Sequence, residues 1–421
     1  MPPEPPRPGD AASERHLAAS RQVVAGAYEA ADRAAGALLA EAWRPADAYH
    51  LRAMARLGMG DHVAAQADAD EALKRDPRHA EARWGRAAVF RARENWAAAI
   101  GDLDELIKDS PRAEHHVARA VAHLRLKRED DARRDLDRAI EIDPSCAGAY
   151  WRRAVVRANG DIDGAIADCN EALKRDARCV PALLRRAAYH HARSRNDDAR
   201  KDYDAALALD PDNCDALTDR AKLRGAMKDE KGALEDLQAA LRAHPEDAGH
   251  AYNCGAMRVS LGQLDAAIAD LERSIQLDAK SAAARRELGR ALAGKGRHAD
   301  AVASFTEALK IDPRFAEAYA ERGESYVALK QFKEGEADYE EAMRIKPGWH
   351  VVHFRRARLH EIRGENHSAI QEYANALLDN PQHLDSLLSR GILNTKMTQY
   401  DAALEDLSTA IRLKPDWGVA Y

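Results

Sequence analysis

Histidine is the residue type whose spacing first suggests a metal site in this sequence. His116 and His123 would share one face of a helix, as would His353 and His360. His115 and His116 have no cysteine or carboxylate partner at the spacing of a zinc site. We therefore expect these histidines to be half-buried packing residues, and we expect no bound metal.

Known catalytic and cofactor-binding motifs are missing from the sequence. There is no GxxxxGK[ST] phosphate loop, no GxSxG, no HExxH and no GxGxxG following a strand. The five cysteines are odd in number and have no paired short spacing, which argues against a disulfide framework and a zinc knuckle. The sequence therefore predicts a protein that is not an enzyme and that needs no cofactor.

Arginines and carboxylates recur in step along the chain. The arginines are followed at a constant interval by aspartates, as in Arg52 and Asp68, Arg86 and Asp102, Arg186 and Asp202, and Arg322 and Asp338. Where the arginine becomes Leu288 the carboxylate becomes Ser304, whereas Cys254 and Asp270 break this rule. We expect a structural ladder of partly buried ion pairs, one per repeat; the alternative is a row of arginines facing a ligand.

The elements that would position these residues are repeats of 34 residues. Eleven segments begin at residues 46, 80, 113, 147, 180, 214, 248, 282, 316, 350 and 384. Position 8 of each segment is alanine or glycine, position 20 is alanine in ten, and position 32 is proline in nine. Small residues let two helices approach closely, and the proline ends the second helix. Each segment therefore predicts a helix-turn-helix unit that must stack on its neighbours to bury a core.

On these residues the chain resembles a tetratricopeptide-repeat protein. The resemblance implies an all-α fold, a right-handed superhelical solenoid of about eleven tandem 34-residue helix-turn-helix repeats, over residues 46–417. Two departures are the smaller residues in place of tryptophan at position 4 and the arginine at position 7. We expect a disordered proline-rich tail over residues 1–11, a capping helix or helix pair over 12–45, and the start of an incomplete twelfth repeat over 418–421.

Such a solenoid offers a concave wall lined by the first helix of each repeat. Candidate partner-binding residues there are Trp84, Trp151, Tyr252 and Phe354 at position 5, and Arg286, Arg290 and Arg358. Packing between first helices would equally explain the aromatic residues, and salt bridges between neighbouring repeats would explain the alternating charges. Family members that grip chaperone C-termini have lysine at position 5 and asparagine at position 9, which no repeat has here, so we do not expect a carboxylate clamp.

Composition narrows the partners further. The net charge of -6 gives no basic field for nucleic acid or an anionic membrane, and there is no apolar run long enough to span one. We expect a cytoplasmic scaffold or adaptor that binds a peptide, helix or partner domain in its groove. The alternative is a regulatory or substrate-recruiting arm of an enzyme whose catalytic domain lies beyond residue 421. RNA binding by helical repeats is a weaker third hypothesis.

Overall fold

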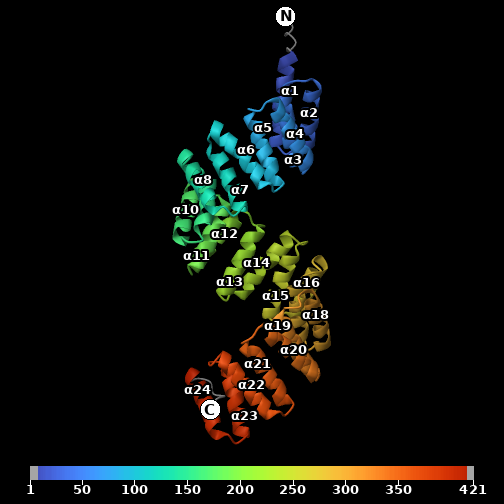
Figure 1. Ribbon diagram of the computed structural model, residues 1–421, viewed down its shortest axis with the longest axis vertical. Coiled ribbons are helices and arrows are strands. Elements are labelled where there is room, and N and C mark those ends of the chain that lie inside the picture. Colours follow the sequence, from blue (N-terminus) through green and yellow to red (C-terminus); the bar gives the residue numbers. More distant parts are fainter. Residues whose placement is uncertain (1–7, 415–421) are drawn as a thin grey trace. The chain divides into compact units, whose positions relative to one another are not determined.

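The computed structural model describes residues 8–414, which form 24 helices and confirm the all-α prediction. The chain divides into two compact units, Met1–Pro211 and Asp212–Tyr421 (Figure 1). In the first unit the helices are α1 (Pro8–Val24), α2 (Tyr28–Ala40), α3 (Pro45–Gly58), α4 (His62–Arg75), α5 (Ala80–Ala92), α6 (Trp96–Asp109), α7 (Ala113–Arg125), α8 (Glu129–Ile142), α9 (Ala147–Arg157), α10 (Ile162–Arg175), α11 (Val180–Ala192) and α12 (Asn196–Leu209).

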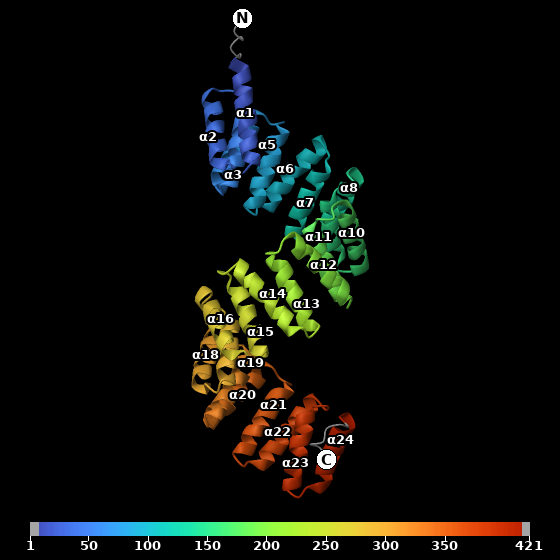
Figure 2. The same ribbon diagram turned by 180° about the vertical axis from the view of Figure 1, so that it is seen from behind.

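The second unit continues the same alternation of first and second helices (Figure 2). Its helices are α13 (Cys214–Ala226), α14 (Glu230–Ala243), α15 (Ala248–Ser260), α16 (Leu264–Leu277), α17 (Ala282–Gly294), α18 (His298–Ile311), α19 (Ala316–Ala328), α20 (Phe332–Ile345), α21 (His350–Ile362), α22 (Asn366–Asp379), α23 (Leu384–Lys396) and α24 (Tyr400–Leu413). Among the described residues, no helix is both long and apolar enough to cross a lipid bilayer.

Within each unit the helices form antiparallel-type pairs that stack in chain order. The odd-numbered helices also touch one another, as α3 touches α5 and α17 touches α19. The odd-numbered helices thus line one side of each unit, which we call the first-helix face. The even-numbered helices pack on its back.

The N-terminal region is a helix pair. Helix α1 begins at Pro8, so the prediction that residues 1–11 lack structure was wrong for residues 8–11. Leu38 of α2 is fully buried in one cluster with Ala12 of α1 and Ala48 of α3. The pair therefore packs against the first helix of the first repeat. Residues 1–7 and the expected twelfth repeat, 418–421, lie outside the described residues.

Small residues allow the close packing inside each pair. Gly289 of α17 lies so near Phe305 of α18 that a Cβ atom there would stand 2.6 Å from the ring. Gly255 meets Leu271 in the same way, also at 2.6 Å. Most of the other repeats use a fully buried alanine at this position, such as Ala53. Because a larger side chain would push the helices apart, the position 8 pattern follows directly from the packing.

The turns inside the repeats use the left-handed backbone region. Gly60, Gly262 and Gly364 have φ values of 82°, 71° and 77°, which glycine adopts without a Cβ penalty. In other repeats a polar residue such as Lys127 takes this conformation, with φ 59°. In some repeats the residue that precedes the second helix caps it, as Asp61 does by accepting a bond from the Ala64 backbone N–H at 3.0 Å.

Candidate functional site on the first-helix face

Eight arginines at repeat position 7 each donate two parallel hydrogen bonds to the aspartate at position 23 of the same repeat. The Nε–Oδ2 distances are 2.8–3.0 Å and the Nη2–Oδ1 distances are 2.6–2.7 Å. The pairs are Arg52–Asp68, Arg86–Asp102, Arg119–Asp135, Arg153–Asp168, Arg186–Asp202, Arg220–Asp236, Arg322–Asp338 and Arg390–Asp406. The aspartates are buried and the arginines are half-buried, so this geometry gives strong, directional pairs.

The third guanidinium nitrogen reaches back to the preceding repeat. Nη1 of Arg86 donates to Asp70 at 2.9 Å, and Nη1 of Arg119 donates to Asp104 at 2.6 Å. Further bonds of this type join Arg153 to Asp137, Arg186 to Asn170 and Arg322 to Thr306. At these five arginines the ladder therefore joins neighbouring repeats as well as the two helices of one repeat.

The exceptions in the two columns have their own partners. Where Cys254 replaces the arginine, Arg258, one helical turn later, pairs with Asp270 instead. In the next repeat, Ser304 donates to the backbone oxygen of Arg285 at 2.7 Å and needs no cation. In the repeat of Cys254 the ion pair is therefore kept, but its arginine lies four residues later, at Arg258.

Ladder pairing shifts the pKa values of its members. The hydrogen bonds to Asp102, against the opposing effect of burial, raise the pKa of Arg86, and the bond to Asp135 does the same for Arg119. Burial alone would raise the pKa of Asp135, but bonds from His116 and Arg119 outweigh it and lower the pKa. The guanidinium of Arg119 and the carboxylate of Asp135 therefore both stay charged at neutral pH.

Three of the four histidines contact carboxylates at repeat position 23, and the fourth, His360, contacts Glu365. His116 Nδ1 lies 3.0 Å from Asp135, and His353 Nδ1 lies 2.7 Å from Glu372. His123 lies 3.7 Å from Asp135, and His360 lies 2.6 Å from Glu365. Within residues 8–414, no three His, Cys, Asp or Glu side chains are grouped as metal ligands would be.

The four position 5 aromatics are half-buried and contact neighbouring repeats. Trp151 packs against Tyr150 and Cys179, and the Arg152 guanidinium lies 4.1 Å from its ring centre. Phe354 lies 5.3 Å, between ring centroids, from His383 of the next repeat. Tyr252 packs against the core cluster around Leu271 and Leu292. Trp84 packs against the core cluster that contains Leu103 and Ala118, and its ring centroid is 5.2 Å from that of His115.

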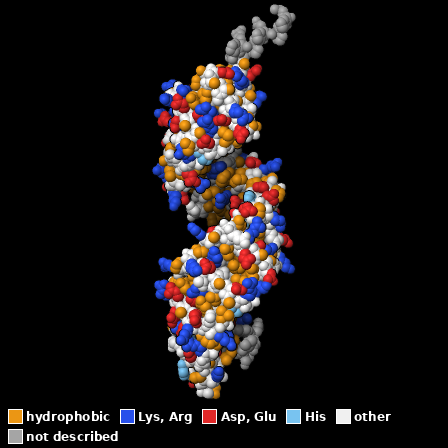
Figure 3. Space-filling model, turned by 90° about the vertical axis from the view of Figure 1, so that its right-hand side faces the viewer, with side chains coloured by type: hydrophobic (Ala, Val, Ile, Leu, Met, Phe, Trp, Pro, Cys, Tyr) orange, Lys and Arg blue, Asp and Glu red, His pale blue; other side chains and the backbone are white. Residues whose placement is uncertain are grey.

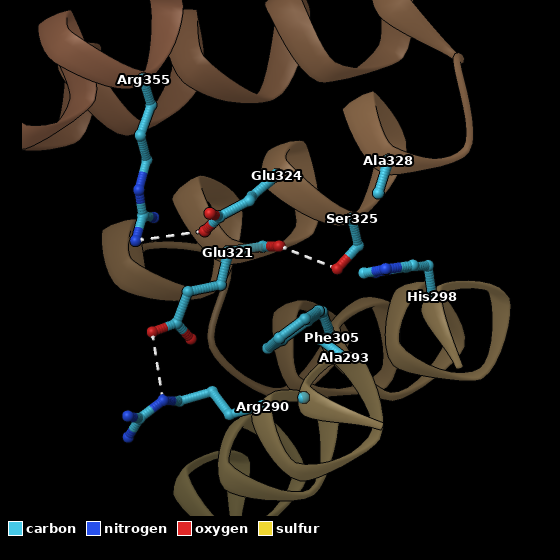
Figure 4. A pocket seen from close by; sticks show the side chains of 10 residues that line it. Arg290, Ala293, His298, Phe305, Glu321, Glu324, Ser325, Ala328 and Arg355 are labelled. Atoms are coloured by element: carbon cyan, nitrogen blue, oxygen red, sulfur yellow. Dashed lines mark hydrogen bonds and ion pairs between the residues drawn. The ribbon is translucent and has the colours of Figure 1, made fainter. Parts of the chain in front are cut away.

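The alternating charges of repeats eight to ten pair with one another (Figure 4). Arg286 donates two bonds to Glu321 at 2.8 and 2.5 Å, and Arg290 lies 3.7 Å from the same carboxylate. Arg355 lies 3.2 Å from Glu324. These pairs therefore bridge neighbouring repeats. Arg290, Glu321, Glu324 and Arg355 also line a hollow of about 470 Å³, in which their charges offset one another.

Arg358 lies apart from these bridges. It is 58% exposed and its Nε lies 3.6 Å from Glu361 on its own helix. Basic and acidic side chains are likewise interspersed over the face seen in Figure 3. Arg286, Arg290, Arg355 and Arg358 therefore all lie close to carboxylates of their own chain.

A different hollow, of about 550 Å³, lies on the first-helix face of the first unit. We call it the α5–α9 groove, because Trp84 and Arg91 line it from α5, Val117 and Val121 from α7, and Arg152 from α9. Sequence reasoning identified Trp84 but missed the two arginines. Neither arginine occupies position 7 of the ladder, and nothing in the sequence distinguishes them from the other arginines outside that position.

Comparisons with known proteins agree with this architecture. The tetratricopeptide repeat model matches residues 50–114, 89–147, 155–213, 218–284, 258–314 and 286–348, which together span more than half of the chain. A search of curated proteins found no significant match.

Several solved structures are similar to parts of the chain. YrrB, described as "a TPR protein with an unusual peptide-binding site", is 24% identical over 42% of this chain and 92% of its own, with a TM-score of 0.38. A tetratricopeptide repeat protein from Parabacteroides merdae is 17% identical over 59% and 99%, with a TM-score of 0.49. Cut9–Hcn1 of the APC/C is 15% identical over 96% and 88%, with a TM-score of 0.46. The family model, matched along most of the chain, shows that this protein belongs to the tetratricopeptide repeat family.

Proposed function

We propose that this chain is a non-catalytic scaffold that holds a segment of a partner protein on its first-helix face. Tetratricopeptide repeat proteins generally mediate protein–protein interactions and are typically non-catalytic, which supports the general class. The odd number of cysteines, without paired short spacing, suits a reducing compartment such as the cytoplasm.

The observation that carries the proposal is the α5–α9 groove. It is open to solvent and crosses three consecutive first helices, so an extended segment several residues long can lie in it. Its floor joins Trp84 to Val117 and Val121, a half-buried apolar strip of the kind that anchors interfaces. Elsewhere the ladder arginines are occupied by carboxylates of their own chain.

Of the residues that the sequence nominated for partner binding, we retain Trp84 as the principal anchor. Trp151 stacks against the guanidinium group of the groove residue Arg152. Tyr252, Phe354, Arg286 and Arg290 contribute mainly to packing and bridges between repeats. Arg358 is assigned no contact with the partner.

Site-specific photo-crosslinking tests this proposal. A benzophenone amino acid at Val121 in the groove should give a discrete adduct with one protein in source-cell lysate. The matched control places the same amino acid at Lys174 on α10, a second helix, where the side chain is 69% exposed. Equal adduct patterns at both positions, or none from Val121, would refute the scaffold proposal.

A further inference from the structure

Two arginines of the α5–α9 groove differ from those of the ladder. Among the described residues, neither Arg91 nor Arg152 has a carboxylate partner. The Nε atom of Arg91 is buried without any hydrogen-bond partner. Arg152 donates from Nη1 to the backbone oxygen of Gly148 at 2.9 Å and lies over the ring of Trp151. Both side chains are half-buried and line the groove.

The environment of these two arginines is unfavourable for a positive charge. Burial lowers the pKa of Arg91, and burial also lowers that of Arg152, to which the nearby charge of Arg91 adds. A half-buried cation without a counter-ion destabilises the fold, and a bound anion would offset this unfavourable free energy. These two arginines therefore favour the binding of a negatively charged group from outside the chain.

The acidic residues of the groove do not supply that charge. Glu114 is 58% exposed and its Oε1 lies 3.4 Å from Nη1 of Arg112. Asp143 accepts bonds from the Ser145 backbone N–H at 2.9 Å and from its hydroxyl at 2.6 Å. Both carboxylates are thus engaged next to the groove rather than with Arg91 or Arg152.

Apolar surface accompanies the two charges. Trp84, Val117 and Val121 line the same groove between α5 and α9. A ligand that is only an anion would leave this strip exposed to water, whereas a peptide can cover the strip and supply a carboxylate. Since the groove is open to solvent and crosses three helices, an internal segment of a peptide can lie along it.

We propose that the α5–α9 groove binds an internal peptide segment in which an aspartate or glutamate adjoins an apolar residue. The side-chain carboxylate lies between Arg91 and Arg152, and the apolar side chain packs on Trp84 and Val121. This inference rests on the proposed function, because it names the chemistry of the partner held by the first-helix face.

Stability separates this role from a structural one. Arg91→Gln and Arg152→Gln together remove two uncompensated charges, so the double variant should unfold at the same or higher temperature than wild type. A ladder variant such as Arg186→Gln instead leaves the buried carboxylate of Asp202 without its arginine partner, so it should unfold at a lower temperature than wild type.

A random dodecapeptide library displayed on phage, in which the peptide C-terminus is not free, tests the inference on the full chain. Wild type should enrich peptides in which Asp or Glu adjoins Leu, Val or Phe. The Arg91→Gln, Arg152→Gln variant should lose this acidic preference, and its affinity for the best selected peptide should fall at least about tenfold in fluorescence polarisation. The control variant, Arg134→Gln with Arg138→Gln, alters two exposed arginines of α8 and should bind as wild type does.

Three results would overturn the inference. They are enrichment of neutral or basic peptides, an acidic preference that survives in the groove variant, or no enriched peptide on wild type. The Val121 crosslink decides the scaffold function separately. A specific adduct without an acidic preference would retain the scaffold and remove the proposed peptide chemistry.

Discussion

Asp135 offers the sharpest test of the ladder. Its carboxylate accepts bonds from Arg119 at 2.9 and 2.6 Å and lies 3.0 Å from Nδ1 of His116. Its side chain is only 5% exposed. The change Asp135→Asn keeps the shape but removes the charge and turns one acceptor into a donor that faces Arg119.

The expected cost follows from what remains around Arg119. Breaking a buried pair costs about 3–5 kcal/mol, but Arg119 is 22% exposed and keeps Asp104 at 2.6 Å. We therefore expect a loss of about 3 kcal/mol, at the lower end of that range. Asp104 is 51% exposed, so Asp104→Asn should cost only about 0.5 kcal/mol.

Urea unfolding followed by circular dichroism at 222 nm would measure both variants. Because stability in a repeat array is a sum of local terms, hydrogen exchange of α7 and α8 should show the loss centred on this repeat. If Asp135→Asn costs no more than Asp104→Asn, the ladder is a surface feature and the reasoning fails.

Three further predictions concern packing and titration. Gly289→Ala forces a Cβ atom against the Phe305 ring and should cost about 1–3 kcal/mol in urea unfolding, whereas Gly101→Ala, with open space around it, should stabilise by about 0.5–1 kcal/mol. Burial, with the charge of a neighbouring histidine, lowers the pKa of His50 to about 4. Below about pH 6.5 the unfolded chain binds a proton at His50 that the folded chain does not bind until about pH 4. Lowering the pH from about 6.5 to 4 should therefore reduce thermal stability by up to about 3 kcal/mol. His50→Gln should reduce this loss, whereas the control His367→Gln, at an exposed histidine, should not. Burial raises the pKa of Cys254 to about 12, so iodoacetamide at about pH 8 should label it, by mass spectrometry, only after unfolding; rapid labelling of the native chain would contradict its burial.

The fold was largely predictable because its packing rule is local. Small residues at positions 8 and 20 recur in every repeat, so the helix pairs could be placed without knowing the rest of the chain. The N-terminal pair lacks that pattern, and its place against α3 depends on contacts such as Leu38 with Ala48. The start of α1 at Pro8 was missed because composition alone marked this proline-rich region as disordered.

The candidate site was less predictable because it depends on which charges lack partners. The joint change to Leu288 and Ser304 indicated that the two columns are linked. The sequence did not show, however, that Arg258, one helical turn after Cys254, donates to Asp270 in place of the missing arginine. Arg91 and Arg152 look like any other surface arginines in the sequence. Only the stacking of α5, α7 and α9 brings them into one groove.

The central claim is that partners bind the first-helix face at the α5–α9 groove. The most direct test measures the affinity of the protein captured by the Val121 crosslink for the unlabelled chain and for two variants. Val121→Glu in the groove should weaken binding at least about tenfold, because it places a charge on the apolar strip. Lys174→Glu on the opposite layer should leave binding unchanged. Equal affinities for both variants would contradict the claim.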